Sequence, residues 1–203
     1  MAIVIRPERP GDYRETEIIT REAFCDIYKP GCDEHLVAHK LRETAAFVRE
    51  LDLVACEGER IVGNIMYTKA RVIGPGGEAR EVLCLGPISV LPEHQGQGIG
   101  GRLIEESVAR AREMGFAGVF LMGNPAYYSK FGFRKAEGFD VRTSDGKSYD
   151  YFMGLELAPG RLKGVSGNFF YDESFHVDAG ELEEFEKLFP KRGKHITSTQ
   201  LQH

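Results

Sequence analysis

The chain has 203 residues, of which 42% are hydrophobic and 28% are charged, and this composition is typical of a soluble globular protein with one domain. The 26 basic and 31 acidic residues give a formal net charge of −5, and no basic block of the kind found in nucleic-acid binders is present. No apolar run approaches the roughly 18 residues that a membrane-spanning helix needs. The first residues also lack the basic start and long apolar core of a signal peptide. We therefore expect neither nucleic acid nor a membrane as a partner.

The first half of the chain predicts two helices and a meander of strands. Asp12, followed three residues later by Glu15, is a capping-box pattern for a helix that ends at Pro30-Gly31, and Asp33 is placed to cap a second helix. Gly74-Pro75-Gly76-Gly77 is a strong turn signal between two apolar stretches. We expect strands over 3–6, 51–55, 61–73 and 79–91, and the second helix over 35–43.

The middle of the chain predicts a strand–loop–helix–strand unit. A strand that ends before Pro92 is followed by a glycine-rich loop, a helix over 100–114 and an apolar strand over 116–122. Such a unit places its two strands parallel. A short helix over 124–130 and a last sheet strand over 149–157 complete an expected domain of residues 1–157.

A C-terminal extension, residues 158–203, begins at the Ala158-Pro159-Gly160 seam. It contains a candidate strand over 169–177, a helix that Asp178 and Glu181 cap and that ends at Pro190, and a polar tail, 191–203, that we expect to fray.

Cysteine usage bears on metal binding and on the compartment. Cys25, Cys32, Cys56 and Cys84 form no Cys-x-x-Cys pair. The spacing therefore favours neither a zinc site nor a disulfide framework. We expect free thiols in a cytoplasmic protein that holds no metal.

The loop Gln95–Gly101 has the character of a phosphate cradle, because glycines before a helix let an anion approach the helix N–H groups. Gly96, Gly98 and Gly101 also satisfy the dinucleotide-binding pattern, but no acidic residue follows the next strand to bind a ribose. The nucleotide P-loop needs Gly-Lys-Ser/Thr, which is absent. A turn that only packs a helix on a strand would not need four glycines in six residues.

Two motifs carry a resemblance to a known family. The segment Gln95-Gly96-Gln97-Gly98-Ile99-Gly100, after the strand that ends Ile88-Ser89-Val90-Leu91-Pro92, resembles the Gln/Arg-x-x-Gly-x-Gly/Ala motif of the GNAT superfamily of N-acetyltransferases. About 30 residues later, Tyr128 to Phe133 resembles the family's Tyr-x-x-x-Gly-Phe signature. Together with the start of the chain, both blocks are similar to the YhbS-like branch of predicted acetyltransferases.

The resemblance implies an α+β fold with a mixed central sheet flanked by helices, in which a splayed pair of parallel strands holds acetyl-CoA. Tyr128 would protonate the departing thiolate. The implied cofactor-binding residues are Ile88, Val90, Gln95, Gly96, Gln97, Gly98, Ile99, Gly100, Gly101 and Asn124. Asn124 is equally placed to cap the short helix.

The implied reaction moves acetyl to a primary amine of a small molecule or of a protein. Some family members carry a glutamate base at the position of Val82, and Glu81 points to the opposite face of the strand. The remaining candidates for the general base are Glu34, His35 and a chain of water molecules. Without a base, the chain could instead be a non-catalytic acyl-CoA-binding sensor. The sequence leaves the acceptor and the oligomeric state open, a homodimer included.

Overall fold

The computed structural model describes residues 2–198 and 200. Among these residues nine strands form one mixed sheet, in the order β1-β2-β3-β4-β5-β8-β6, with β7 and β9 branching from the far end of β3. The strands are β1 (Ile3–Pro7), β2 (Leu53–Glu57), β3 (Arg60–Ile73), β4 (Ala79–Val90), β5 (Gly118–Met122), β6 (Arg134–Lys135), β7 (Val141–Arg142), β8 (Phe152–Glu156) and β9 (Gly167–Phe170).

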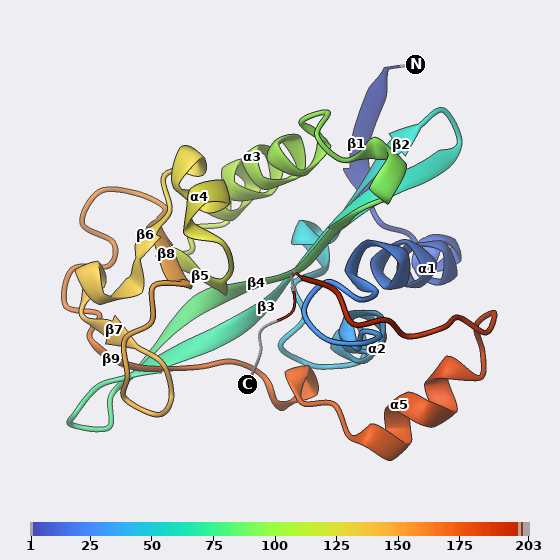
Figure 1. Ribbon diagram of the computed structural model, residues 1–203. Helices are drawn as coiled ribbons and strands as arrows, with labels where there is room; N and C mark the ends of the chain where they lie inside the picture. The colour runs from blue at the N-terminus through green and yellow to red at the C-terminus, as the bar shows by residue number, and fades with distance from the viewer. Residues whose placement is uncertain (1, 199, 201–203) are drawn as a thin grey trace.

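Helices cover both faces of this sheet (Figure 1). The helices are α1 (Tyr13–Phe24), α2 (Glu34–Leu41), α3 (Ile99–Glu113), α4 (Pro125–Tyr128) and α5 (Ala179–Glu186). Helices α3 and α4 lie on one face, while α1, α2 and α5 lie on the other. No helix in the described part of the chain is long and apolar enough to cross a membrane.

The core forms where the apolar stripe of α3 packs on the sheet. Leu103, Ile104, Val108 and Ala111 repeat at helical spacing and are buried against the strands. Because this stripe is continuous along the helix, α3 is held firmly, and the position of its first turn is fixed relative to the end of β4.

The first two helices differ from the sequence predictions at their ends. The Asp12 carboxylate does not cap α1; it accepts the Arg9 N–H at 2.8 Å and pairs with Arg6, so it caps the preceding 3-10 turn instead. Asp33 likewise pairs with Lys29 and makes no capping bond to α2. Helix α1 ends at Phe24, earlier than predicted, because Asp26 takes a left-handed backbone conformation with φ of 62°.

The C-terminal segment joins the main sheet. The predicted strand over 169–177 is shorter and earlier: β9 covers Gly167–Phe170 and pairs with the end of β3, and a 3-10 turn, Glu173–Phe175, follows it. The predicted cap of α5 is confirmed, since the Asp178 carboxylate accepts the N–H groups of Gly180 and Glu181. The predicted polar tail is irregular over 191–198, and residues 199 and 201–203 lie outside the described residues.

Candidate active site

The candidate site begins where β4 and β5 part. These strands pair in parallel only at Leu83–Val119 and Cys84–Phe120, although β4 continues to Val90. Beyond the last pair, no strand of the described residues pairs with β4 on the β5 side. The expected splayed pair of parallel strands is therefore present, and it leaves backbone hydrogen-bonding groups for a ligand.

The hydrogen bonds of β4 to β3 show which of these groups face the gap. The Leu91 N–H donates to Val62 O at 2.9 Å, which makes this antiparallel pair a hydrogen-bonded one. Hydrogen-bonded and non-bonded pairs alternate along the ladder. Val90 and Ile88 therefore direct their N–H and C=O groups away from β3 and into the gap. The Val90 carbonyl already accepts the Gln95 side-chain amide at 3.0 Å.

The glycine-rich loop leads from β4 to the first turn of α3. Gly96 and Gly98 have φ of 74° and 81°, and a Cβ atom at either position would meet no atom within 4 Å. Gly98 is the N-cap of α3, and no side chain caps this helix. Among the described residues the N–H groups of the first turn therefore have no side-chain cap, and the partial positive charge of the helix N-terminus attracts an anion.

The other two glycines also have a packing role. A Cβ atom on Gly100 would lie 2.6 Å from the Tyr127 hydroxyl oxygen, and one on Gly101 would lie 3.1 Å from the Phe131 ring. These glycines therefore let α4 and the turn after it pack against α3. Packing against α4 and the turn after it therefore requires glycine at Gly100 and Gly101, whereas no such contact accounts for Gly96 and Gly98.

The remaining predicted loop residues have their side chains occupied. Gln97 donates its side-chain amide to Glu93 O at 3.2 Å, which bends the loop back toward β4. Ile99 is 2% exposed and packs in the core. Ile99 can therefore contribute only main-chain groups to a ligand.

Tyr128 is the last residue of α4, the short helix that follows β5. Its side chain is buried, and its ring contacts the rings of Tyr127 and Phe133. Burial, followed by the neighbouring Tyr127, raises the pKa of Tyr128 above its usual value. Among the described residues its hydroxyl has no hydrogen-bond partner, so a protonated phenol is available to a ligand.

Asn124 caps α4. Its side-chain oxygen accepts the Ala126 N–H at 2.9 Å, which settles the capping role that the sequence left open. The side-chain nitrogen is not used by this cap. The structure thus brings α4, the end of β4 and the start of α3 together around one gap.

The candidate bases differ sharply in their surroundings. Val82 is fully buried, and Glu81 is exposed beside Lys69, on the other face of β4. His35 is fully buried and lies 3.0 Å from Glu186 of α5; burial lowers the pKa of His35 to about 4. Glu34 is half-buried at the start of α2, and burial raises the pKa of its carboxyl. Only Glu34 combines partial access with a raised pKa.

A buried polar cluster that the sequence analysis missed lies behind β4. Ser89, between Ile88 and Val90, donates to the Asn64 side-chain oxygen at 2.5 Å, and Thr20 of α1 lies 3.2 Å from Ser89. The Asn64 side-chain nitrogen has no partner among the described residues. No local sequence pattern predicts this cluster, because its members lie 25 to 69 residues apart in the chain.

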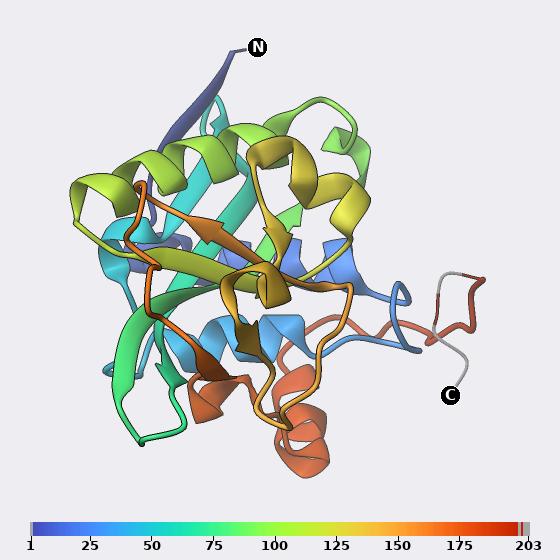
Figure 2. The same cartoon turned by 90° about the vertical axis from the view of Figure 1, so that its left-hand side faces the viewer.

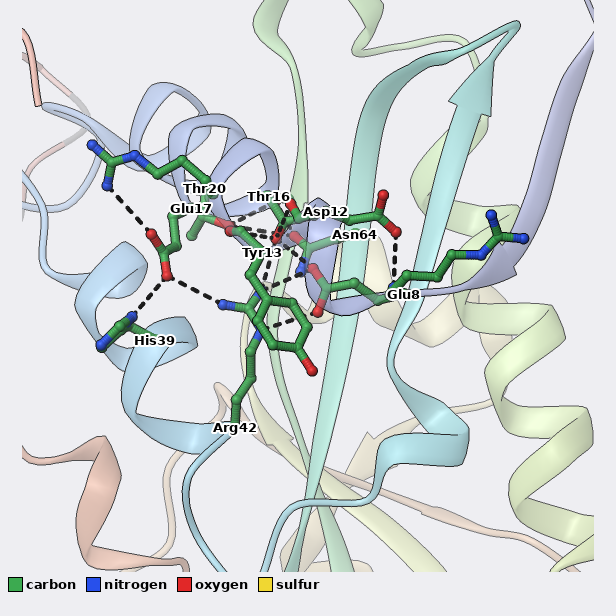
Figure 3. Close-up of polar contacts among 12 residues, drawn as sticks. Glu8, Asp12, Tyr13, Thr16, Glu17, Thr20, His39, Arg42 and Asn64 are labelled. Atoms are coloured by element: carbon green, nitrogen blue, oxygen red, sulfur yellow. Dashed lines mark hydrogen bonds and ion pairs between the residues drawn. The ribbon is translucent and has the colours of Figure 1, made fainter.

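Figure 3 shows a second set of polar contacts on the same face of the sheet, under α1. Arg42, which follows α2, donates to the Glu8 carboxylate at 2.9 Å and to the Thr16 hydroxyl at 2.7 Å. Glu17 accepts from His39 of α2 at 2.8 Å. These buried and half-buried pairs fix α1 and α2 to each other and to the start of the chain.

Within the described residues no group of three or more His, Cys, Asp or Glu side chains is arranged to hold a metal ion. All four cysteines are free thiols.

Comparison with known proteins agrees with this geometry. Residues 5–136 match the family model of the acetyltransferase (GNAT) domain. The chain is 31% identical, over 175 residues, to the uncharacterized N-acetyltransferase YhbS of Escherichia coli strain K12, an alignment that covers 86% of this chain and 99% of YhbS.

Two solved structures are similar over most of the chain. A GNAT family N-acetyltransferase (YhbS) from Escherichia coli, in complex with CoA, has a TM-score of 0.76 at 30% identity and covers 85% of this chain and 91% of its own. A GNAT family acetyltransferase from Brucella melitensis, in complex with acetyl-CoA, has a TM-score of 0.70 at 32% identity. It covers 86% of this chain and 99% of its own. The predicted fold class and family are confirmed: the chain belongs to the GNAT family of acetyltransferases.

Proposed function

We propose that this acetyltransferase moves the acetyl group of acetyl-CoA to a primary amine of a small molecule or of a protein. The observation that carries the proposal is the gap between β4 and β5, together with the uncapped N-terminus of α3 beside it. An extended arm bearing a diphosphate fits both features: the arm adds to the free edge of β4, and the diphosphate binds the helix N–H groups. The relatives solved with CoA and acetyl-CoA support this assignment.

In this proposal the main-chain N–H groups of Gln97 to Gly101 bind the diphosphate of the donor. Gln95 and Gln97 shape the loop through their bonds to Val90 and Glu93, and Gly96 and Gly98 keep its outer side clear. The main chain of Ile88 binds the pantetheine arm, and the Val90 N–H holds the thioester oxygen as negative charge develops on it. The unused nitrogen of Asn124 gives the arm a further donor.

Acetyl transfer requires that one proton be delivered to the CoA sulfur and that another be removed from the amine nitrogen. The amine nitrogen attacks the thioester carbon, the C–S bond breaks, and the Tyr128 hydroxyl gives its proton to the sulfur. Tyr128 suits this step because its raised pKa keeps the phenol protonated at neutral pH.

Glu34 is the base that we favour among the candidates. A carboxyl whose pKa is raised toward neutrality removes a proton more effectively than an ordinary surface carboxylate. His35 is fully buried against Glu186, so an acceptor has no access to its ring.

The four free thiols support a cytoplasmic location, as expected for a protein that keeps its cysteines reduced. We propose that residues 158–203 are an extension of the catalytic domain.

Two measurements test the proposal. Calorimetric titration with acetyl-CoA should show saturable binding, and a free-thiol assay over a panel of primary amines should show release of CoA that depends on the amine. Binding without thiol release on any amine would favour the rival function, a non-catalytic acyl-CoA sensor. Absence of binding would contradict both functions.

A further inference from the structure

Helix α1 is directed at the point where β4 and β5 part. The Glu15 carboxylate accepts the Ile61 N–H at 3.0 Å, and Thr20, more than one turn later, lies beside Asn64 and Ser89. The helix therefore advances along β3 and runs antiparallel to β4. Its next turn ends at Phe24, toward the start of the gap.

The loop that follows α1, residues 25–33, we call the acceptor-side loop. In Figure 2 this loop, drawn in blue, lies on the same side of the view as α4, drawn in yellow. Burial first, then Tyr127 and then Tyr28 of this loop raise the pKa of Tyr128, so Tyr28 lies within electrostatic range of the Tyr128 phenol. An amine that approaches the thioester past Tyr128 therefore passes this loop.

The C-terminal segment is bound to the helices on either side of this loop. Glu186 of α5 accepts two hydrogen bonds from the Arg21 guanidinium, at 3.1 and 2.7 Å, and lies 3.0 Å from His35. Arg21 is near the end of α1, and His35 is in the first turn of α2. One carboxylate thus joins the two helices that the acceptor-side loop connects.

The tail after α5 is bound to the loop itself, contrary to the expectation that it frays. The Asp26 carboxylate accepts the N–H of Gly31 at 2.7 Å, within the loop, and the N–H of His195 at 3.0 Å, from the tail. Thr197 and Gln200 donate to the Asp26 main-chain carbonyl at 2.7 and 3.0 Å. Asp26 is only 8% exposed, so these bonds are shielded from water.

We propose that Asp26 and Glu186 are positioning residues, and that they fasten residues 185–198 and 200 to the acceptor-side loop so that the loop holds one conformation when the amine binds. The inference rests on the proposed function for its effect on the amine, but the attachment itself is a separate claim. Neither residue touches the reacting atoms; each acts through the loop.

Asp26→Gly tests the attachment, because glycine adopts the left-handed backbone at φ of 62° without strain and removes the carboxylate. Asp140→Gly is the matched control. Asp140 also has a left-handed backbone, with φ of 58°, but its side chain is exposed. A hydrogen bond to a charged acceptor is strong enough that its loss speeds amide exchange by about tenfold or more. We expect this increase at Gly31 and His195 in Asp26→Gly and not in Asp140→Gly.

The kinetic test uses the amine with the fastest thiol release in the panel. Asp26→Gly should raise the KM for that amine by about tenfold, while the KM for acetyl-CoA and the kcat stay near wild type. Asp26→Asn should restore both amide protection and the KM, because its side-chain oxygen still accepts the two N–H groups and asparagine tolerates a left-handed backbone.

Glu186→Gln provides a second, independent variant. Its control is Glu181→Gln on the same helix, where the carboxylate makes an exposed ion pair with Lys40 at 2.7 Å. We expect faster exchange in residues 25–33 and a higher amine KM for Glu186→Gln only.

Unchanged exchange in both Asp26→Gly and Glu186→Gln would overturn the attachment. Faster exchange with an unchanged amine KM would overturn the positioning role. Failure of the proposed function would look different: no variant, nor the wild type, would release thiol, although the exchange results would still decide the attachment.

Discussion

Two glycines at opposite ends of α3 allow the ligand-binding role of the loop to be separated from its structural role. Gly98 and Gly115 have φ of 81° and 82°, and a Cβ atom at either would meet nothing within 4 Å. Gly98 precedes the first residue of α3, and Gly115 follows its last turn, roughly 25 Å away at 1.5 Å per residue. Alanine at either position therefore introduces the same backbone strain and no clash.

The strain of one left-handed alanine is about 1–2 kcal/mol. For a chain of this size, each kcal/mol lowers the melting temperature by roughly 2–4 °C. Gly98→Ala and Gly115→Ala should therefore lose similar stability in thermal unfolding. Only Gly98→Ala places a methyl group at the N-cap of α3, beside the first-turn N–H groups that we propose bind the diphosphate. We expect it to weaken CoA binding by about tenfold or more, which is about 1.4 kcal/mol.

The assay is calorimetric titration of CoA into both variants and the wild type, at a temperature where all three are folded. Gly115→Ala should bind CoA as the wild type does. If the two variants bind CoA with the same affinity, the reasoning from the loop geometry is refuted, whatever their stabilities.

Three further predictions concern single side chains. Tyr128→Phe should lower kcat by about a hundredfold through loss of a proton donor, with CoA affinity nearly unchanged, as thiol-release kinetics and titration would show; an unchanged kcat would remove the acid role. Glu34→Gln should lower kcat and abolish the acidic limb of its pH profile, since the raised pKa belongs to that carboxyl, and a retained limb would exclude it as the base. Burial, with Glu8 nearby, raises the pKa of Asp52 to about 10, so the folded chain keeps a proton that the unfolded chain loses near pH 4. The free energy of unfolding should therefore fall as the pH rises from about 4 to about 10, by at most about 1.4 kcal/mol per pH unit, and Asp52→Asn should flatten that slope in urea titrations; a slope unchanged by the substitution would contradict the assignment.

The strand–loop–helix unit could be predicted from sequence because its signals are local. The apolar run that ends at Val90 and the glycines at positions 96 and 98 lie within a few residues of the features they determine. The same holds for the Asp178 cap of α5, where the acceptor and its donors are two and three residues apart.

Local reasoning failed where a side chain had a competing partner. Asp12 satisfies the capping pattern of α1, but Arg6 and the Arg9 N–H occupy its carboxylate. The roles of Gly100 and Gly101 also depended on neighbours more than 25 residues away, Tyr127 and Phe131. A sequence pattern cannot rank such partners, because their distances are set only once the chain is folded.

The long-range polar contacts of the acceptor-side loop could not be predicted from the sequence for the same reason. His195 binds Asp26 from 169 positions away, and Glu186 reaches Arg21 across 165. A polar tail without periodicity predicts fraying, and only the folded position of the Asp26 carboxylate shows why this tail is held.

The proposed function depends on contact between the N–H groups at the start of α3 and a diphosphate. The most direct measurement is a nuclear magnetic resonance titration of the ¹⁵N-labelled protein with CoA and, separately, with pantetheine, which lacks the diphosphate. If these N–H groups bind the diphosphate, the amide signals of Gln97 to Gly101 should shift strongly with CoA and little with pantetheine. If CoA binds at saturation while those signals stay in place, the central claim is wrong.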